Sequence, residues 1–221
     1  MKIETRPLEN FTKVSFRDFG KLILIQGSTP SLTIEADEEL LPEIISEVRG
    51  DTLTLGFAED WFERLGKMIS SIFSSKNYDI TYTLTVVDIS KIKISGKCDL
   101  ECESLTADSL ELNISGLGNM SFSRLDCNTL DVQISGRGYF SAAGRASDVN
   151  LRITGSADYQ AGDLASQNMH VVISGQGEAE VRVEEKLDIT ISGVGHVNYY
   201  GNPKLRQVIS GVGKSKRLNE T

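Results

Sequence analysis

Hydrophobic and polar side chains alternate along most of the chain, and glycine interrupts the alternation at regular intervals. The tripeptide Ile-Ser-Gly, once as Ile-Thr-Gly, recurs seven times, with spacings of 20, 20, 19, 20, 18 and 18 residues. Its isoleucines are Ile94, Ile114, Ile134, Ile153, Ile173, Ile191 and Ile209. Alternation with period two is typical of half-buried β-strands. Each repeat therefore predicts two strands that meet at a glycine corner.

Equivalent positions of the repeats carry similar side chains. A hydroxyl residue follows each motif isoleucine: Ser95, Ser115, Ser135, Thr154, Ser174, Ser192 and Ser210. An antiparallel meander or barrel could use the same turns, but it would set different repeat positions opposite each other. Parallel strands about 4.8 Å apart bring equal positions into register. The pattern favours an all-β fold, a single-stranded parallel β-helix (β-solenoid) of about seven coils of 18–20 residues.

A second small-residue column follows two residues after the motif glycine. Its members are Cys98, Gly118, Gly138, Ala157, Gly177, Gly195 and Gly213. Such a column indicates either a turn that needs positive φ or close packing of neighbouring backbones. The sequence leaves both explanations open.

The first 90 residues do not follow the repeat, and we expect them to cap one end of the stack. Strand-like alternation occurs at 12–17, 21–26, 31–35, 52–57 and 80–87, and residues 37–42 suit a short helical turn. A bare sheet edge promotes aggregation, so a solenoid needs protected ends. We therefore predict one continuous domain, with a β-rich capping part at 1–90 and regular coils at 91–221.

The far end of the predicted solenoid has different protection. Lys214, Lys216 and Arg217 follow the last glycine corner and are suited to keep an edge soluble. Gln207 stands where earlier coils have an apolar residue. We expect an irregular last coil, and an end at which copies of the chain can associate.

One segment of the capping part has a different period. Between residues 59 and 75 the apolar side chains recur with helical spacing, which predicts an amphipathic helix. The stripe consists of Trp61, Phe62, Leu65, Met68, Ile69, Ile72 and Phe73. Two roles stay open for this stripe: packing on the solenoid as part of the cap, or docking of a partner, a membrane or a second copy.

Composition narrows the chemistry. The net charge of −8 disfavours nucleic-acid binding, and no apolar run approaches the roughly 20 residues of a transmembrane helix. Three cysteines, Cys98, Cys102 and Cys127, without regular spacing argue against a disulfide framework. We expect Cys102 to be buried and Cys98 to be partly accessible. His170 and His196 suit surface positions, and we expect no metal, cofactor or catalytic site.

The repeated Ile-Ser-Gly-x-Gly, the lead-in at 81–96 and the segment at 34–42 resemble the family described as putative auto-transporter adhesin, head GIN domain. The likeness runs from about residue 10 to residue 213. The resemblance implies a right-handed β-solenoid, usually bacterial and exported to the periplasm or cell surface, without a catalytic motif. The chain begins without a recognisable signal peptide, so a trimmed exported protein and a cytoplasmic relative both stay open.

We therefore expect a non-catalytic interaction module with an unknown protein or glycan ligand. Tyr139, Tyr159, Tyr199 and Tyr200 are candidates for sugar stacking, although Tyr159 and Tyr199 fall in inward columns. A purely structural spacer is an alternative. A carbohydrate-active, pectinase-like enzyme is another, because Glu111 and Asp131 stand about one strand spacing apart in an outward column.

Overall fold

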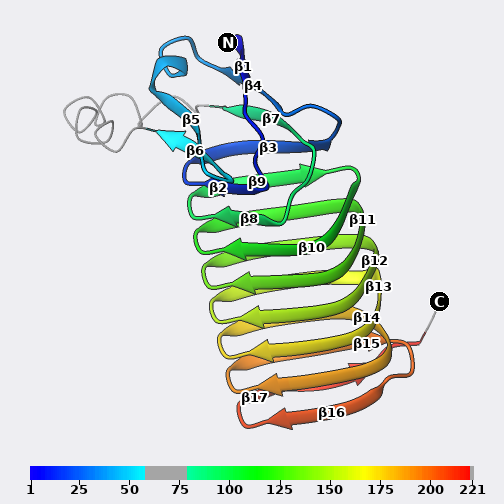
Figure 1. Cartoon of the computed structure of the whole chain (residues 1–221). Helices are drawn as coiled ribbons and strands as arrows, with labels where there is room; N and C mark the ends of the chain where they lie inside the picture. Colours follow the sequence, from blue (N-terminus) through cyan, green and yellow to red (C-terminus); the bar gives the residue numbers. More distant parts are fainter. Residues whose placement is uncertain (58–78, 220–221) are drawn as a thin grey trace, which may run out of the picture.

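The computed structural model describes residues 1–57 and 79–219, and 76% of these described residues are in β-strands. The strands form the stack of coils in Figure 1. They are β1 (Lys2–Pro7), β2 (Lys13–Phe16), β3 (Phe19–Gln26), β4 (Ser31–Ala36), β5 (Ile44–Arg49), β6 (Thr52–Phe57), β7 (Thr81–Val86), β8 (Lys91–Ile94), β9 (Lys97–Cys102), β10 (Leu105–Ile114), β11 (Leu117–Ile134), β12 (Arg137–Ile153), β13 (Ser156–Ile173), β14 (Gln176–Ile191), β15 (Val194–Tyr200), β16 (Lys204–Ile209) and β17 (Val212–Arg217). A 3-10 helix, η1, covers Leu41–Glu43, close to the predicted helical turn.

Equal repeat positions lie on one another, as the sequence predicted. Ile94 pairs with Ile114, and each later motif isoleucine pairs with its counterpart in the next coil, through parallel ladders that end at Ile209. All the isoleucines from Ile94 to Ile191 are buried. The β-solenoid fold is therefore confirmed. The number of coils is corrected to about six turns, since seven corners enclose six complete turns.

The interior is filled by the inward columns of the coils. Phe140 and Tyr159 stack with ring centroids 4.8 Å apart, and Phe122 lies 6.0 Å from Phe140. Such aromatic contacts stabilise the core in addition to the burial of apolar area. Cys98, Cys102 and Cys127 are free thiols that also lie in this interior. The expectation that Cys98 is partly accessible is wrong: the thiol is 1% exposed, because its strand stacks between β3 and β11.

Close approach of backbones explains both small-residue columns. A Cβ on Gly136 would lie 2.0 Å from the carbonyl oxygen of Gly116. In the second column, a Cβ on Gly138 would lie 3.0 Å from the oxygen of Gly118. Neither glycine has positive φ. Of the two explanations that the sequence left open, close packing of neighbouring coils holds.

The capping part changes from parallel to antiparallel pairing. β4 pairs antiparallel with β7, β1 with β4, and β5 with β6. The sequence predicted β2, β3, β4, β6 and β7 within a few residues, but it missed β1 and β5. The irregular N-terminal cap is thus a set of antiparallel strands on the end of the parallel stack.

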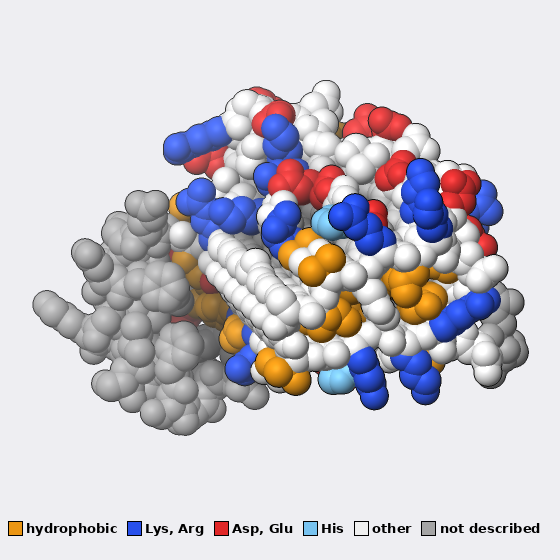
Figure 2. Space-filling view, turned by 90° about the horizontal axis from the view of Figure 1, so that it is seen from below, with side chains coloured by type: hydrophobic (Ala, Val, Ile, Leu, Met, Phe, Trp, Pro, Cys, Tyr) orange, Lys and Arg blue, Asp and Glu red, His pale blue; other side chains and the backbone are white. Residues whose placement is uncertain are grey.

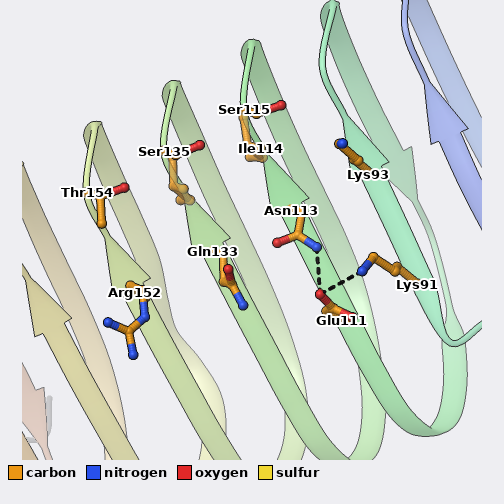
Figure 3. Close-up of a pocket in the computed structure, with 11 residues that line it drawn as sticks. Lys91, Lys93, Glu111, Asn113, Ile114, Ser115, Gln133, Ser135, Arg152 and Thr154 are labelled. Atoms are coloured by element: carbon orange, nitrogen blue, oxygen red, sulfur yellow. Dashed lines mark hydrogen bonds and ion pairs between the residues drawn. The ribbon is translucent and has the colours of Figure 1, made fainter.

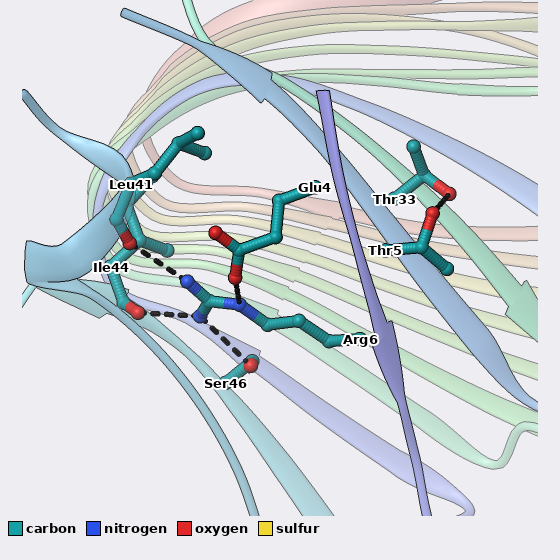
Figure 4. A network of polar contacts seen from close by, with 7 residues as sticks. All are labelled: Glu4, Thr5, Arg6, Thr33, Leu41, Ile44 and Ser46. Carbon is teal, nitrogen blue, oxygen red and sulfur yellow. Dashed lines mark hydrogen bonds and ion pairs between the residues drawn. The ribbon is translucent and has the colours of Figure 1, made fainter. Parts of the chain in front are cut away.

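Arg6 on β1 fastens the outer strand of the cap to its neighbours (Figure 4). Its guanidinium donates to the carbonyl oxygens of Leu41 and Ile44 at 2.8 and 2.6 Å, and to the hydroxyl of Ser46 at 3.1 Å. Glu4 accepts from the Arg6 Nε at 2.6 Å. A planar guanidinium can make several directed bonds at once, which an ammonium group cannot.

The order of the first coils in space differs from their order in the chain. β2 pairs in parallel with both β6 and β8, and β3 with both β7 and β9. The coil formed by β2 and β3 is therefore held between two segments that follow it in sequence. The predicted amphipathic helix at 59–75, with its stripe from Trp61 to Phe73, lies outside the described residues.

Candidate binding grooves

Two outward faces meet along the ridge of Ile-Ser-Gly corners, and each carries a groove. The strands that precede the corners carry a groove of about 340 Å³, which we call the corner groove (Figure 3). The lining residues are Lys91, Lys93, Glu111, Asn113, Ile114, Ser115, Gln133, Ile134, Ser135, Arg152 and Thr154. They come from β8, β10, β11 and β12 and from the corners that follow these strands.

The corner groove is built from columns that the parallel register places side by side. Lys93, Asn113, Gln133 and Arg152 are successive members of one outward column. The hydroxyls of Ser115, Ser135 and Thr154 lie at the adjoining corners in Figure 3. The groove thus presents cations, amides and hydroxyls in rows at the spacing of the strands.

The corner groove is cationic on an acidic protein. It holds Lys91, Lys93 and Arg152 against the single carboxylate of Glu111, whereas the chain carries a net charge of −8. Glu111 is bound by Lys91 at 2.9 Å and by the amide of Asn113 at 2.8 Å. Within the described chain, the charges of Lys93 and Arg152 are not paired with a carboxylate. A local field of this kind attracts anionic groups.

The sequence placed Glu111 and Asp131 next to each other, and the structure confirms the register of this pair. Hydrogen bonds from Asn113 and Lys91 lower the pKa of Glu111. Asp131 accepts a hydrogen bond from Asn150 at 2.8 Å. A glycosidase needs one carboxyl that stays protonated as the general acid. A lowered pKa at Glu111 is the opposite of that requirement.

The strands that follow the corners carry two grooves, both lined by Tyr139, with volumes of about 380 and 320 Å³. Tyr139 is 42% exposed. Arg137, Asn119 and Asp158 line one of these grooves, and Gln160 lines the other. An exposed aromatic ring between planar polar groups suits the stacking of a sugar ring.

The other candidate tyrosines do not share this position. Tyr159 is fully buried, and Tyr199 is partly buried against the core. The ring of Tyr200 lies under the Arg182 guanidinium, 4.8 Å from ring centroid to Cζ, and its hydroxyl lies 3.3 Å from a Glu180 oxygen. Only Tyr139 of the four therefore presents an open ring to a groove.

The three cysteine thiols are buried in the core, whereas the two histidines lie at the surface. Burial raises the pKa of Cys98 to about 12 and those of Cys102 and Cys127 to about 11. Such thiols stay protonated and are poor nucleophiles. His170 is exposed and His196 is partly exposed. In the residues that the structure describes, no three His, Cys, Asp or Glu side chains gather as a metal site would require.

Sequence reasoning drew attention to the column of Glu111 and Asp131 and missed the adjacent column that lines the corner groove. The available signal was the pattern Lys93, Asn113, Gln133, Arg152, two residues later in the same coils. All four side chains are polar, and no acidic residue of the same column neutralises the charges of Lys93 and Arg152.

The only helical element in the described residues is the short η1, so no helix there could span a membrane.

Known structures share this architecture over almost their whole length. A putative adhesin from Bacteroides fragilis is 26% identical, with a TM-score of 0.87, and the match covers 98% of this chain and 97% of the other. A putative adhesin from Parabacteroides merdae is 20% identical (TM-score 0.68; 99% and 96% covered). A putative lipid binding protein from Parabacteroides distasonis is 17% identical (TM-score 0.70; 99% and 96% covered).

The last two likenesses support the fold alone. No curated protein matches the chain. A family model described as putative auto-transporter adhesin, head GIN domain, matches residues 10–203, which include every strand from β2 to β15. With its stacked Ile-Ser-Gly corners and antiparallel cap, the chain belongs to the putative auto-transporter adhesin, head GIN domain family.

Proposed function

We propose that the protein is an adhesin-like, non-catalytic binding module that acts outside the cytoplasm and holds an acidic polysaccharide in the corner groove. The cationic character of this groove on a chain of net charge −8 carries the proposal. The family and the Bacteroides fragilis relative support an adhesin-like role in general. The ligand class is our own inference.

The groove chemistry matches a chain of sugar acids. Lys93 and Arg152 can pair with carboxylates, and a guanidinium binds a carboxylate through two parallel hydrogen bonds. Asn113 and Gln133 offer amides that can both donate to and accept from sugar hydroxyls. The strand spacing of about 4.8 Å repeats these groups along the stack, so a linear polymer can contact several coils at once.

Calorimetric titration with a defined oligogalacturonate tests the proposal. We expect saturable binding that weakens as sodium chloride rises, because the attraction between exposed charges is screened by salt. The double variant Lys93→Ala with Arg152→Ala should weaken binding by about tenfold or more. A neutral oligosaccharide of the same length should bind far less.

Controls separate this groove from the alternatives. Lys97→Ala with Arg137→Ala removes the same charge from the other face and should leave binding unchanged. If Tyr139→Ala abolishes binding and the Lys93/Arg152 variant does not, the ligand occupies the grooves beside Tyr139 and the proposal is wrong. Release of reducing sugar ends that stops with Asp131→Asn would instead reveal the enzyme alternative.

A further inference from the structure

The C-terminal end of the solenoid has two unpaired strand edges. In the described residues β16 pairs only with β14, and β17 pairs only with β15. Each therefore presents one free row of backbone donors and acceptors. Such an edge is a template for another extended strand. The opposite end differs, because antiparallel strands cover it.

The free end also leaves apolar side chains without a covering coil. Leu205 and Ile209 are the inward residues of β16 and are only partly buried, whereas their counterparts Leu187 and Ile191 are fully buried. Val208 and Val212, on either side of the last corner, are 54% and 69% exposed. Figure 2, a view of this end, shows hydrophobic side chains among lysine and arginine.

A polar pair sits between these apolar residues. Gln207 takes the inward position that Ile189 holds one coil earlier, and Ser215 takes that of Val197. The Ser215 hydroxyl donates to Gln207 at 2.5 Å across the end of the core. This polar pair allows the end of the core to remain in contact with water when no partner is bound. Such an end is better suited to a partner that binds transiently than to a permanent one.

The C-terminal end is cationic, which favours an acidic partner. Residues 201–219 hold five cationic side chains and no carboxylate, namely Lys204, Arg206, Lys214, Lys216 and Arg217. No ion pair engages any of the five within the described chain. A symmetric pair of copies joined through this end would bring two such cationic rims together, which costs free energy. An acidic strand meets no such repulsion.

We propose that the free edge of β16 binds an extended, acidic segment of another protein, which adds to the ladder as one further parallel strand. Its inward side chains are apolar and contact Leu205 and Ile209. Its outward side chains include a carboxylate opposite Arg206. The solenoid already contains this arrangement on the other edge of β16, where Asp188 is the register partner of Arg206.

A peptide with the sequence of residues 184–192, labelled with a fluorophore, is the probe. These residues include the segment that pairs with β16 in the fold, Lys186 to Ile191. We expect saturable binding by fluorescence anisotropy, weakened about tenfold or more by Arg206→Glu and by raised salt. The peptide with lysine in place of Asp188 should bind correspondingly less. Lys204→Glu, a second variant at the same edge, should likewise weaken peptide binding.

A matched control is Arg145→Glu, an exposed cation in the middle of the solenoid, on β12. It should leave peptide binding unchanged, and circular dichroism should show that all variants fold. Absence of binding, or equal binding of the two peptides, would overturn the proposal. So would self-association of the protein through this end, measured by light scattering and lost in Ile209→Lys, because the occupant would then be a second copy.

Discussion

The glycine of each Ile-Ser-Gly corner is fixed by the distance to the coil beside it. At Gly116, Gly136, Gly155, Gly175 and Gly193 a Cβ would lie 2.0–2.1 Å from a carbonyl oxygen of the preceding corner. No heavy atom fits at that distance, so the backbone would have to separate and lose ladder hydrogen bonds such as Ser135 N to Ile114 O at 2.9 Å.

Gly136→Ala should therefore destabilise the protein by about 3 kcal/mol or more. The matched control is Gly56→Ala, where the nearest atom to a new Cβ is the Arg17 Cβ at 3.3 Å. We expect that variant to change the free energy of unfolding by about 1 kcal/mol or less. Urea denaturation measures both. Equal effects would show that corner packing is not the reason for the glycine.

Asp18 is the buried acid of the first corner and is 5% exposed. Its Oδ2 has no hydrogen-bond partner, and neither does the buried hydroxyl of Tyr82. Loss of hydration raises the pKa of Asp18 from 3.8 to about 7, against a weaker opposing effect of the Phe19 backbone N–H. The folded state therefore binds this proton more tightly than the unfolded state does.

The sign of the resulting pH dependence follows from linkage. Between about pH 4 and pH 7 the unfolded chain releases the Asp18 proton while the folded chain keeps it, so stability falls as pH rises through this window. The free energy of unfolding that is lost across this window is up to about 4 kcal/mol. Asp18→Asn should flatten this part of the stability curve, as measured by urea denaturation from pH 4 to pH 8. An unchanged slope would contradict the assignment.

At the scale of the element, one coil is the unit that the ladders repeat. Coils of 20 and 19 residues already stack on each other, with a register shift between Phe122 and Leu125 that absorbs the difference. The spacing between corners is therefore less restricted than the corners themselves. Stability in such stacks is a sum of coil and neighbour contributions.

Deletion of residues 117–136 should thus leave a folded, shorter solenoid, because it joins Gly116 to Arg137 and keeps the Ile-Ser-Gly-x-Gly corner. We expect the same circular dichroism shape and a denaturant m-value lower by about a tenth, in proportion to the surface lost. The control is a deletion of residues 122–131, which removes only half a coil and should prevent folding. If both deletions fold equally well, equal stacking of positions does not hold the molecule together.

At the scale of the whole molecule, the repeat made the solenoid predictable and the ends less so. Strict alternation around seven isoleucines specifies the ladders, since only parallel stacking brings like positions together. β1 and β5 have mixed patterns, in which the apolar Ile3 and Ile45 are exposed, and they are strands because they pair with β4 and β6. That pairing is a long-range contact, which local alternation does not reveal.

The candidate site was predictable only in part, for a similar reason. The register gave the neighbours of Glu111, but the charge of the groove depends on which of Lys91, Lys93 and Arg152 is neutralised. That outcome depends on side-chain geometry, in which Glu111 turns to Lys91. The amphipathic stripe at 59–75 stays a prediction.

The place of the first coil between later segments sets the order in which the chain can assemble during synthesis. Residues 13–26 emerge from the ribosome early, yet their partners on the two sides, 52–57 with 81–86 and 91–102, emerge only afterwards. A nascent chain that folded strictly from its beginning would leave this coil without neighbours. The coil of β2 and β3 therefore gains both of its neighbours only after residues up to 102, about half of the chain, have been made.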